Sequence, residues 1–308
     1  MPTGTVTEGH MEWETHTTWY QVVGTIEPGG SGLAPVVLAH GGPGASHDYI
    51  EPIAELARSG RACILYDQVG CGRSQRLPEA PAEFWTVELF KRELVELTRT
   101  LGIDSRYHLL GQSWGGMLAM EHALDHPHGL LSIVVCDSPA SMVLWVEEAN
   151  RLREELPAEV QAALTHHEEA GTTADPAYEE AVEVFYRRHL CRVEWPDCLK
   201  RSFASIAADP TVYHTMNGPS EFHCIGSLRT WDITDRLHEI DVPTLLVSGA
   251  HDEATPRIVD EIHQLVPGSR WELFQDSSHT PHLEEPEAFL RVVEEFLTEV
   301  EAPTEASA

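Results

Sequence analysis

Short runs of valine, isoleucine and leucine alternate with longer segments of helical periodicity along most of this chain. The expected strands are residues 34–40, 61–67, 106–111, 130–137, 242–250 and 269–275. The expected helices are residues 49–59, 87–101, 114–126, 257–265 and 287–300. This alternation predicts βαβ units, and therefore an α/β fold whose mostly parallel sheet carries helices on both faces. An earlier stretch, residues 17–26, alternates like an antiparallel edge strand.

The character of the sequence changes between about residues 141 and 230. Strand-like runs stop there, and Glu- and Ala-rich helical segments such as WVEEANRLREEL and AEVQAALTHHEEA follow, broken by prolines. We expect an inserted all-helical cap at 141–230 between two parts of one core, 1–140 and 231–308. A chain of 308 residues is long enough for one such domain with its insertion.

Acidic residues far outnumber basic ones: 50 Asp and Glu stand against 20 Lys and Arg, a formal net charge of −30. Such a surface repels phosphate backbones and anionic lipids, so we expect neither nucleic-acid nor membrane binding, while cationic substrates are attracted. The same charge is also typical of adaptation for solubility or salt. The six cysteines form no CxxC pair, and no secretory signal is recognisable, so we expect a cytoplasmic protein. Composition leaves the oligomeric state open.

Ser113 lies between two glycines in GQSWG, where the strand 106–111 is followed by the helix 114–126. A sharp strand-to-helix turn forces the middle residue into a strained backbone conformation, and larger neighbours than glycine would collide there. The hydroxyl then projects above the sheet, at the positive end of a helix. This context predicts a nucleophile rather than a serine in an ordinary turn.

A serine hydroxyl is a weak nucleophile and needs a base. In this architecture an acid and a histidine follow the serine in that order, each after a later strand. SGAHDEATP offers Asp252 and QDSSHTPH offers His279. We expect His279 to take the Ser113 proton and Asp252 to orient the imidazole. The competing residues are Asp276 and Glu253 as acids, and His282 and His251 as bases.

The tetrahedral oxyanion of such a reaction needs two backbone donors, which form an oxyanion hole. One is expected from the N–H of Trp114, the residue after the nucleophile. The other is expected from the loop HGGPG, residues 40–44, which follows the strand 34–40. Its glycines allow the backbone to approach closely; we favour the Gly42 N–H, with that of Gly41 as the alternative.

Histidines are numerous, 18 in all, and two clusters could suggest metal ligands. Neither HHE (166–168) nor HTPH (279–282) has the HExxH spacing of a zinc site with a third ligand in view. We therefore expect no metal and no cofactor.

Several ordered motifs give the chain a family resemblance: HGGPGASHDY, YDQVGCGRS, GQSWGG, MNGPSEF, WDIT and GAHDEATP. Together they resemble the proline iminopeptidases of the α/β-hydrolase fold, most nearly the branch with the tricorn-interacting aminopeptidase and bacterial L-amino-acid amidases. The likeness runs from about residue 20 to residue 297. It implies a helical cap over the active site and a triad on Ser113, Asp252 and His279.

The resemblance also implies a site for the free α-ammonium group of the substrate. It assigns this site to Glu221 of the NGPxEF motif and to Glu253 beside the triad aspartate, with Tyr213 of the cap as a substrate contact. Two carboxylates in a water-poor pocket are costly unless a cation joins them, which agrees with an ammonium ligand. The alternatives are a turn carboxylate for Glu221, a plain loop residue for Glu253 and a packing residue for Tyr213.

The expected function is a cofactor-independent serine hydrolase that acts through an acyl-enzyme. Its substrates would be short peptides or amino-acid amides with a free amino terminus, from which it releases proline or another neutral or apolar residue. The loop HGGPGASH and the turn GQSWGG depart from the HGGPGGG and GGSWGS of strict proline iminopeptidases, which favours broader first residues or amides. An esterase, lactonase or other small-acyl hydrolase on the same scaffold is the alternative, and a non-catalytic small-molecule binder is the remote one.

Overall fold

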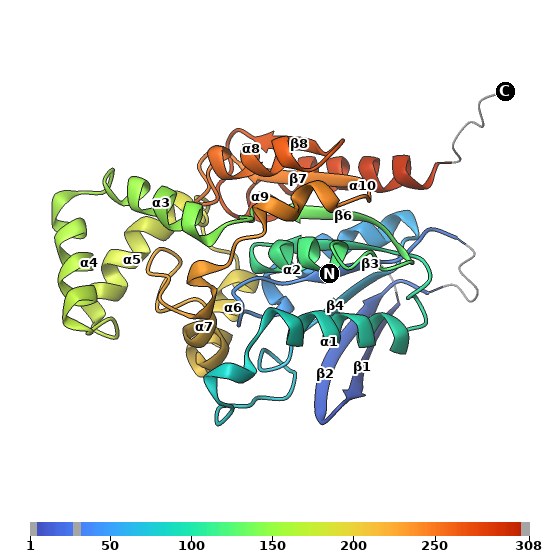
Figure 1. Ribbon diagram of the computed structural model, residues 1–308, viewed down its shortest axis with the longest axis horizontal. Helices are drawn as coiled ribbons and strands as arrows, with labels where there is room; N and C mark the ends of the chain where they lie inside the picture. Colours follow the sequence, from blue (N-terminus) through green and yellow to red (C-terminus); the bar gives the residue numbers. More distant parts are fainter. Residues whose placement is uncertain (1–4, 27–31, 303–308) are drawn as a thin grey trace.

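The strands of this computed structural model, which describes residues 5–26 and 32–302, form one eight-stranded sheet (Figure 1). Their order is β1-β2-β4-β3-β5-β6-β7-β8. The pairs β1–β2 and β2–β4 are antiparallel, and all other neighbours are parallel. The bounds are β1 (Val6–Trp13), β2 (His16–Val23), β3 (Val36–Ala39), β4 (Cys63–Tyr66), β5 (Tyr107–Gln112), β6 (Leu130–Cys136), β7 (Thr244–Gly249) and β8 (Arg270–Phe274).

Helices cover both faces of this sheet. Alternate strand residues point to opposite sides, so Val37 and Leu109 face α1, α2 and α8, whereas Leu38 and Leu110 face the 3₁₀ helix η2 and α10. The predicted α/β fold with a mostly parallel sheet is therefore confirmed. The bounds of the covering helices are η2 (His47–Ser59), α1 (Val87–Thr100), α2 (Trp114–Ala123), α8 (Pro256–Leu265) and α10 (Pro286–Glu301), with the short η3 (Ala82–Phe84) and α9 (Pro281–Glu284).

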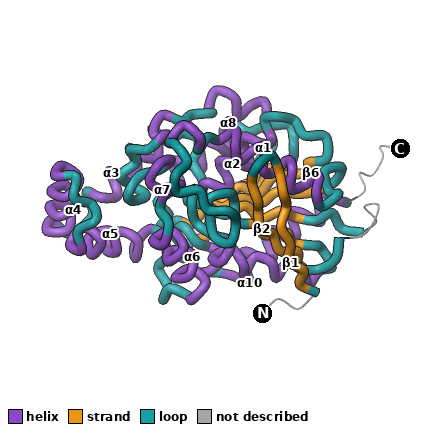
Figure 2. The backbone as a smooth tube through the Cα atoms, turned by 90° about the horizontal axis from the view of Figure 1, so that it is seen from below, coloured by secondary structure: helices purple, strands orange, loops and turns teal. Residues whose placement is uncertain are grey.

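Between β6 and β7 the described chain contains helices and no strand of the sheet. Figure 2 shows α3, α4 and α5 at one end of the molecule, away from the strands. Ser141 and Asp232 form an isolated antiparallel bridge, so the chain enters and leaves this segment at one place. The division at 141 and 230 stays a prediction. The helices here are α3 (Met142–Arg153), α4 (Ala158–Ala170), α5 (Pro176–His189), α6 (Asp197–Ala208), α7 (Thr211–Met216), η4 (Ser227–Thr230) and η5 (Thr234–Glu239).

Two elements differ from the sequence prediction. Strand β1 was not predicted, because it lies at the edge of the sheet and most of its residues are exposed, with Met11 and Trp13 the buried ones. Residues 49–59 were predicted as a helix of ordinary periodicity, but η2 has the tighter 3₁₀ geometry and contains Pro52. A proline inside a helix lacks the N–H that an α-helical hydrogen bond needs, so the helical type differs from the expectation.

Two further observations concern the cysteines and the length of the apolar helices. All six cysteines are free thiols, and four of them are buried. No helix within residues 5–26 and 32–302 is long and apolar enough to cross a membrane.

Candidate active site

Ser113 occupies the turn between β5 and α2. Its backbone has φ 55° and ψ −122°, a strained conformation for a residue with a side chain. Both neighbouring glycines are needed for steric reasons: a Cβ on Gly111 would collide with the Gly115 carbonyl, and one on Gly115 with that of Ala39. The Ser138 hydroxyl donates to the Ser113 carbonyl oxygen at 2.8 Å and so supports the turn. The local sequence therefore forms the turn that was expected around Ser113.

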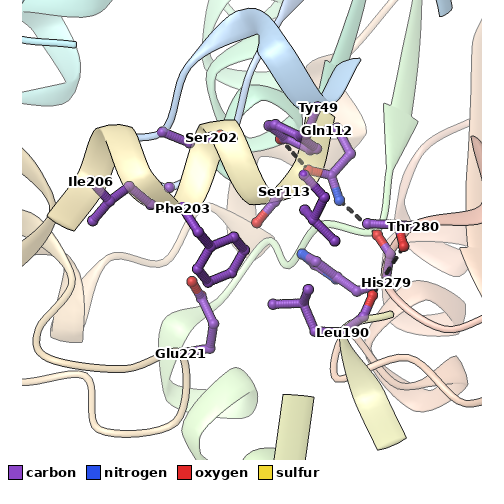
Figure 3. Close-up of a pocket in the computed structure, with 13 residues that line it drawn as sticks. Tyr49, Gln112, Ser113, Leu190, Ser202, Phe203, Ile206, Glu221, His279 and Thr280 are labelled. Carbon is purple, nitrogen blue, oxygen red and sulfur yellow. Dashed lines mark hydrogen bonds between the residues drawn. The ribbon is translucent and has the colours of Figure 1, made fainter. Parts of the chain in front are cut away.

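His279 and Asp252 form a hydrogen-bonded pair. The imidazole Nδ1 lies 2.7 Å from Asp252 Oδ1, and both residues are buried at the ends of loops that follow β8 and β7. Burial alone would lower the His279 pKa, but the charge and hydrogen bond of Asp252 outweigh it and raise that pKa above its ordinary value. Ser113 and His279 line the same pocket (Figure 3). Among the described residues no hydrogen bond joins Ser113 Oγ to His279 Nε2; such bonds are often long in ligand-free sites.

The alternative acids and bases in these two loops lie in different environments from Asp252 and His279. Asp276 and His251 are exposed. His282 is buried, but its Nε2 is hydrogen bonded to a backbone carbonyl of η2 at 3.0 Å. Glu253 is also buried, and its Oε1 lies 3.8 Å from His279 Nε2, the nitrogen that does not contact Asp252. No group of three or more His, Cys, Asp or Glu side chains in the described part of the chain is arranged to hold a metal ion.

The two residues whose N–H groups are expected to bind an oxyanion lie at the pocket of Ser113. Gly42 and Trp114 both line it, and the Trp114 N–H, in the first turn of α2, has no acceptor within its helix. The alternative donor, the Gly41 N–H, is already engaged because it donates to the Tyr49 hydroxyl at 2.7 Å. Gly42 has φ 111°, and a Cβ there would collide with the backbone two and three residues ahead. This geometry favours Gly42 over Gly41 as the donor.

Two glutamines hold the loops of the site together, and sequence reasoning missed both. Gln68 accepts a hydrogen bond from the Trp114 indole at 2.8 Å and donates to the His40 carbonyl at 2.9 Å. It thereby joins α2 to the HGGPG loop. Gln112, directly before the serine, donates from Nε2 to the His279 carbonyl at 2.8 Å (Figure 3). A glutamine at a strand end gives no sequence signal for such a long-range contact.

Glu221, Glu253 and Tyr213 form an acidic cluster beside the serine. The Tyr213 hydroxyl donates to Glu221 Oε1 at 2.7 Å, and Figure 3 shows the Glu221 side chain at the pocket. Both carboxyl oxygens of Glu253 are buried, and neither has a hydrogen-bond partner among the described residues. Burial raises the pKa of both glutamates; for Glu253 the charges of Glu221 and Asp252 raise it further. A bound cation would favour the ionised form of both groups, so the cluster is chemically suited to an ammonium ion.

Two aromatic residues of the helical segment hold the backbone of Glu221. The Glu221 N–H donates to the Tyr186 hydroxyl at 3.4 Å, and the Trp145 indole donates to the Glu221 carbonyl at 2.7 Å. Tyr186 was not predicted as a site residue. It lies on an amphipathic helix, α5, where an aromatic side chain usually indicates packing, so the pattern carried no signal for its hydroxyl.

The pocket has two lobes that share Gly42, Ser113 and Glu221. The first lobe lies against α6, and the second lies against α3 and α2. The main apolar side chains are Leu190, Leu199, Phe203 and Ile206 in the first lobe, and Met117, Met142, Trp145 and Leu228 in the second. Ser113 therefore has an apolar space on either side.

The chain is similar to known proteins over most of its length. The family model for the alpha/beta hydrolase fold matches residues 34–286. A proline iminopeptidase from Saccharolobus solfataricus is 40% identical over 266 residues, which cover 86% of this chain and 85% of that protein. The solved structure of VinJ has a TM-score of 0.93 and 47% identity, covering 97% of this chain and 100% of VinJ. The solved proline iminopeptidase of Mycobacterium smegmatis has a TM-score of 0.88 and 48% identity, covering 96% of this chain and 98% of that one.

Proposed function

This chain belongs to the proline iminopeptidases of the α/β-hydrolase fold, and we propose that it releases an N-terminal residue from short peptides or amino-acid amides. The released residue is proline or another neutral or apolar amino acid. The observation that carries this proposal is the pair formed by the half-buried Glu221 and the buried Glu253 beside Ser113, because an ester or lactone without an amine would leave both carboxyl groups without a cation.

In the first half of the reaction, Ser113 Oγ attacks the substrate carbonyl carbon while His279 Nε2 takes the hydroxyl proton. Asp252 holds the proton on Nδ1 and stabilises the imidazolium. The N–H groups of Gly42 and Trp114 stabilise the oxyanion. His279 then gives its proton to the leaving nitrogen, the C–N bond breaks, and the aminoacyl group remains as an ester on the serine.

In the second half, water replaces the leaving group. His279 takes a proton from the water as the oxygen attacks the ester carbonyl, and the same N–H groups stabilise the second oxyanion. When this intermediate collapses, the imidazolium returns its proton to Ser113 Oγ and the free amino acid leaves. The enzyme is then in its starting state, without a metal or cofactor in any step.

Recognition of the free amine fixes which bond is cut. Glu221 and Glu253 bind the α-ammonium group, with Tyr213 holding the Glu221 carboxylate. Because the scissile carbonyl is attached to the carbon that bears this ammonium group, the carbonyl of the first residue lies over Ser113. A blocked or internal residue would place an uncharged amide against these two carboxyl groups, which costs binding energy.

The two lobes of the pocket support a division between the released residue and the leaving group. The lobe against α3 suits an apolar side chain, and the lobe against α6 suits the leaving group. Neither lobe has a lysine or arginine among its described lining residues. A leaving group with a free carboxylate therefore gains no ion pair, which favours amides and apolar leaving groups. In this proposal the segment 141–230 caps a core of 1–140 and 231–308, and the free cysteines support a cytoplasmic location.

The proposal is tested with two substrates and two enzymes. The substrates are an aminoacyl p-nitroanilide and its N-acetylated form; the enzymes are the wild type and Glu221→Gln. The wild type should strongly prefer the free amine. The substitution should lower kcat/KM for that substrate by about ten- to a hundredfold, the loss of a hydrogen bond to a charged group, ~1.5–3 kcal/mol.

The control is labelling of the serine by a fluorophosphonate, which carries no amine. Labelling should persist in Glu221→Gln and disappear in Ser113→Ala. Equal wild-type rates on the free and acetylated substrates would contradict the aminopeptidase assignment and favour an esterase. Absence of labelling in the folded wild type would instead favour a binding protein without catalysis.

A further inference from the structure

A second buried aspartate lies beside the triad. Asp137 follows β6, the strand between β5, which leads to Ser113, and β7, which leads to Asp252. Its N–H donates to the Val247 carbonyl of β7 at 2.8 Å, and the Ser113 N–H donates to the Cys136 carbonyl of β6 at the same distance. The backbone of Asp137 is thus fixed between the nucleophile and the acid, at the carboxyl edge of the sheet.

Three of the four carboxyl oxygens of the two aspartates lack a hydrogen-bond donor among the described residues. Asp137 is fully buried, and neither of its oxygens has a hydrogen-bond partner among the described residues; the same holds for Asp252 Oδ2. The other oxygen, Asp252 Oδ1, accepts from His279 Nδ1 at 2.7 Å and from the Ala254 N–H at 2.8 Å. Two ionised carboxylates cannot share a dry site at low cost, so one of them must hold a proton. The two donors on Asp252 Oδ1 have no counterpart on Asp137, which leaves the proton to Asp137.

The surroundings of Asp137 agree with this protonation. Burial raises the pKa of Asp137 well above its ordinary range, and the nearby Asp252 carboxylate raises it further, while the Gln112 side chain opposes the shift without reversing it. The other titratable groups that face Asp137 are Glu284 of α9, Tyr49 of η2 and the neighbouring Cys136. None of these three groups supplies a positive charge that would favour an ionised Asp137.

We propose that Asp137 carries a proton and donates it in a hydrogen bond to Asp252 Oδ2, which makes Asp137 a positioning residue of the triad. This bond fixes the orientation of the Asp252 carboxylate and draws part of its negative charge away from His279. The imidazole then stays unprotonated at a lower pH than a fully charged aspartate would allow, and it is free to accept the Ser113 proton. The inference rests on the proposed function, because it assigns a role within the same triad.

Two substitutions at Asp137 distinguish the effect of the hydrogen-bond donor from the effect of a charged carboxyl group. Asp137 has φ 53°, a conformation that Asn and Gly tolerate better than other residues, so both variants preserve the backbone. Asp137→Asn keeps a donor of similar shape without a charge. It should retain kcat within about threefold, and the acid limb of its kcat/KM profile should not move, since no charge has changed.

Asp137→Gly removes the donor. Its kcat should fall about tenfold or more with little change in KM, and its acid limb should move to higher pH because Asp252 regains its full charge. Unchanged kinetics in Asp137→Gly would overturn the proposal. So would an acid limb of Asp137→Asn that moves to lower pH, because this shift would mean that the wild-type Asp137 is ionised.

An infrared measurement tests the proton without relying on activity. The difference spectrum of wild type minus Asp137→Asn at neutral pH should contain the carbonyl stretch of one protonated carboxylic acid, and this band should shift in D₂O. Absence of the band overturns the proposal even if the glycine variant does not fold. The same band is expected in a Ser113→Ala background. If Ser113→Ala still hydrolyses the substrate, the proposed function is refuted. The infrared band still decides in that case whether Asp137 carries a proton.

Discussion

The protonation of His279 decides whether Ser113 can be activated. A general base must be unprotonated when substrate arrives, and burial favours that neutral form. The charge of Asp252 opposes burial and dominates, so the imidazole holds a proton at a higher pH than a free histidine does. The enzyme therefore loses its base on acidification earlier than a solvated histidine would suggest.

This raised pKa predicts the acid limb of the pH profile. For a neutral ester substrate, kcat/KM should fall as the pH drops through a value above about 6.5, the ordinary pKa of histidine. Steady-state kinetics from pH 5 to pH 9 would measure it. A free-amine substrate should lose additional activity in acid, because the raised pKa of Glu221 and Glu253 makes them neutral there. An ester profile whose acid limb lies at or below 6.5 would refute the prediction.

Site residues that follow a strand could be predicted from the sequence. Contacts to the site from a distant helix or loop could not. Asp252 and His279 were predicted as acid and base because each lies in the loop after a predicted strand. Asp137 also follows a strand, but the predicted strand 130–137 included this residue. A predicted strand that ended at Cys136, as β6 does, would have placed Asp137 among the candidate acids. The choice between Gly41 and Gly42 depends on the Tyr49 hydroxyl of η2, a contact that local sequence does not encode.

At the level of elements, α5 of the helical segment is joined to both catalytic loops. The His189 carbonyl, in its last turn, accepts from the Glu253 N–H at 3.3 Å and from the His279 N–H at 3.2 Å. The Thr280 hydroxyl donates to the next carbonyl, that of Leu190, at 3.1 Å. These bonds orient the backbone beside the proposed base and the proposed amine site, so the end of α5 contributes to the shape of the candidate active site.

Helix α3 supplies a second connection, which can be tested by its effect on stability. The buried Glu148 accepts from the Thr255 hydroxyl at 2.7 Å and pairs with Arg257 at 2.9 Å. Glu148→Ala leaves the buried Thr255 hydroxyl without this acceptor and removes one of the two carboxylate partners of Arg257, so it should lower the free energy of unfolding by about 1–3 kcal/mol. The matched control is Glu147→Ala, because this exposed neighbour also pairs with Arg257. Its substitution should lower the free energy of unfolding by at most about 1 kcal/mol. Equal losses in urea denaturation would contradict the role given to Glu148.

The elements that the sequence predicted well are those with a long face against the core. In α1, for example, Leu89, Phe90, Leu94 and Leu97 are buried at helical spacing. The edge strand β1 pairs with one strand only, so most of its residues stay exposed, and the alternation of buried with exposed residues is limited to its end, at Met11 and Trp13. The 3₁₀ form of η2 depends on Pro52 and on packing against the sheet, which the apolar pattern alone does not specify.

At the scale of the whole molecule, the net charge of −30 should influence how substrates arrive. Because the field attracts cations, kcat/KM for a free-amine substrate should fall as ionic strength rises from about 0.01 M to about 1 M, over which the Debye length shrinks from about 30 Å to about 3 Å. The control is the rate of labelling by an uncharged fluorophosphonate, which should change little. Identical salt dependence for both reagents would show that the net charge does not attract the substrate, and would leave solubility as its role.

The bridge between Ser141 and Asp232 sets limits on how such a molecule can diversify. The two ends of the helical insertion meet, so an insertion of another length can join the sheet at the same points with a small change in closure entropy. The last turn of α5 is different, since its carbonyl groups hold the catalytic loops. The outer helices, α4 above all, can therefore diverge in length and sequence, while the end of α5 must be inherited together with the proposed triad.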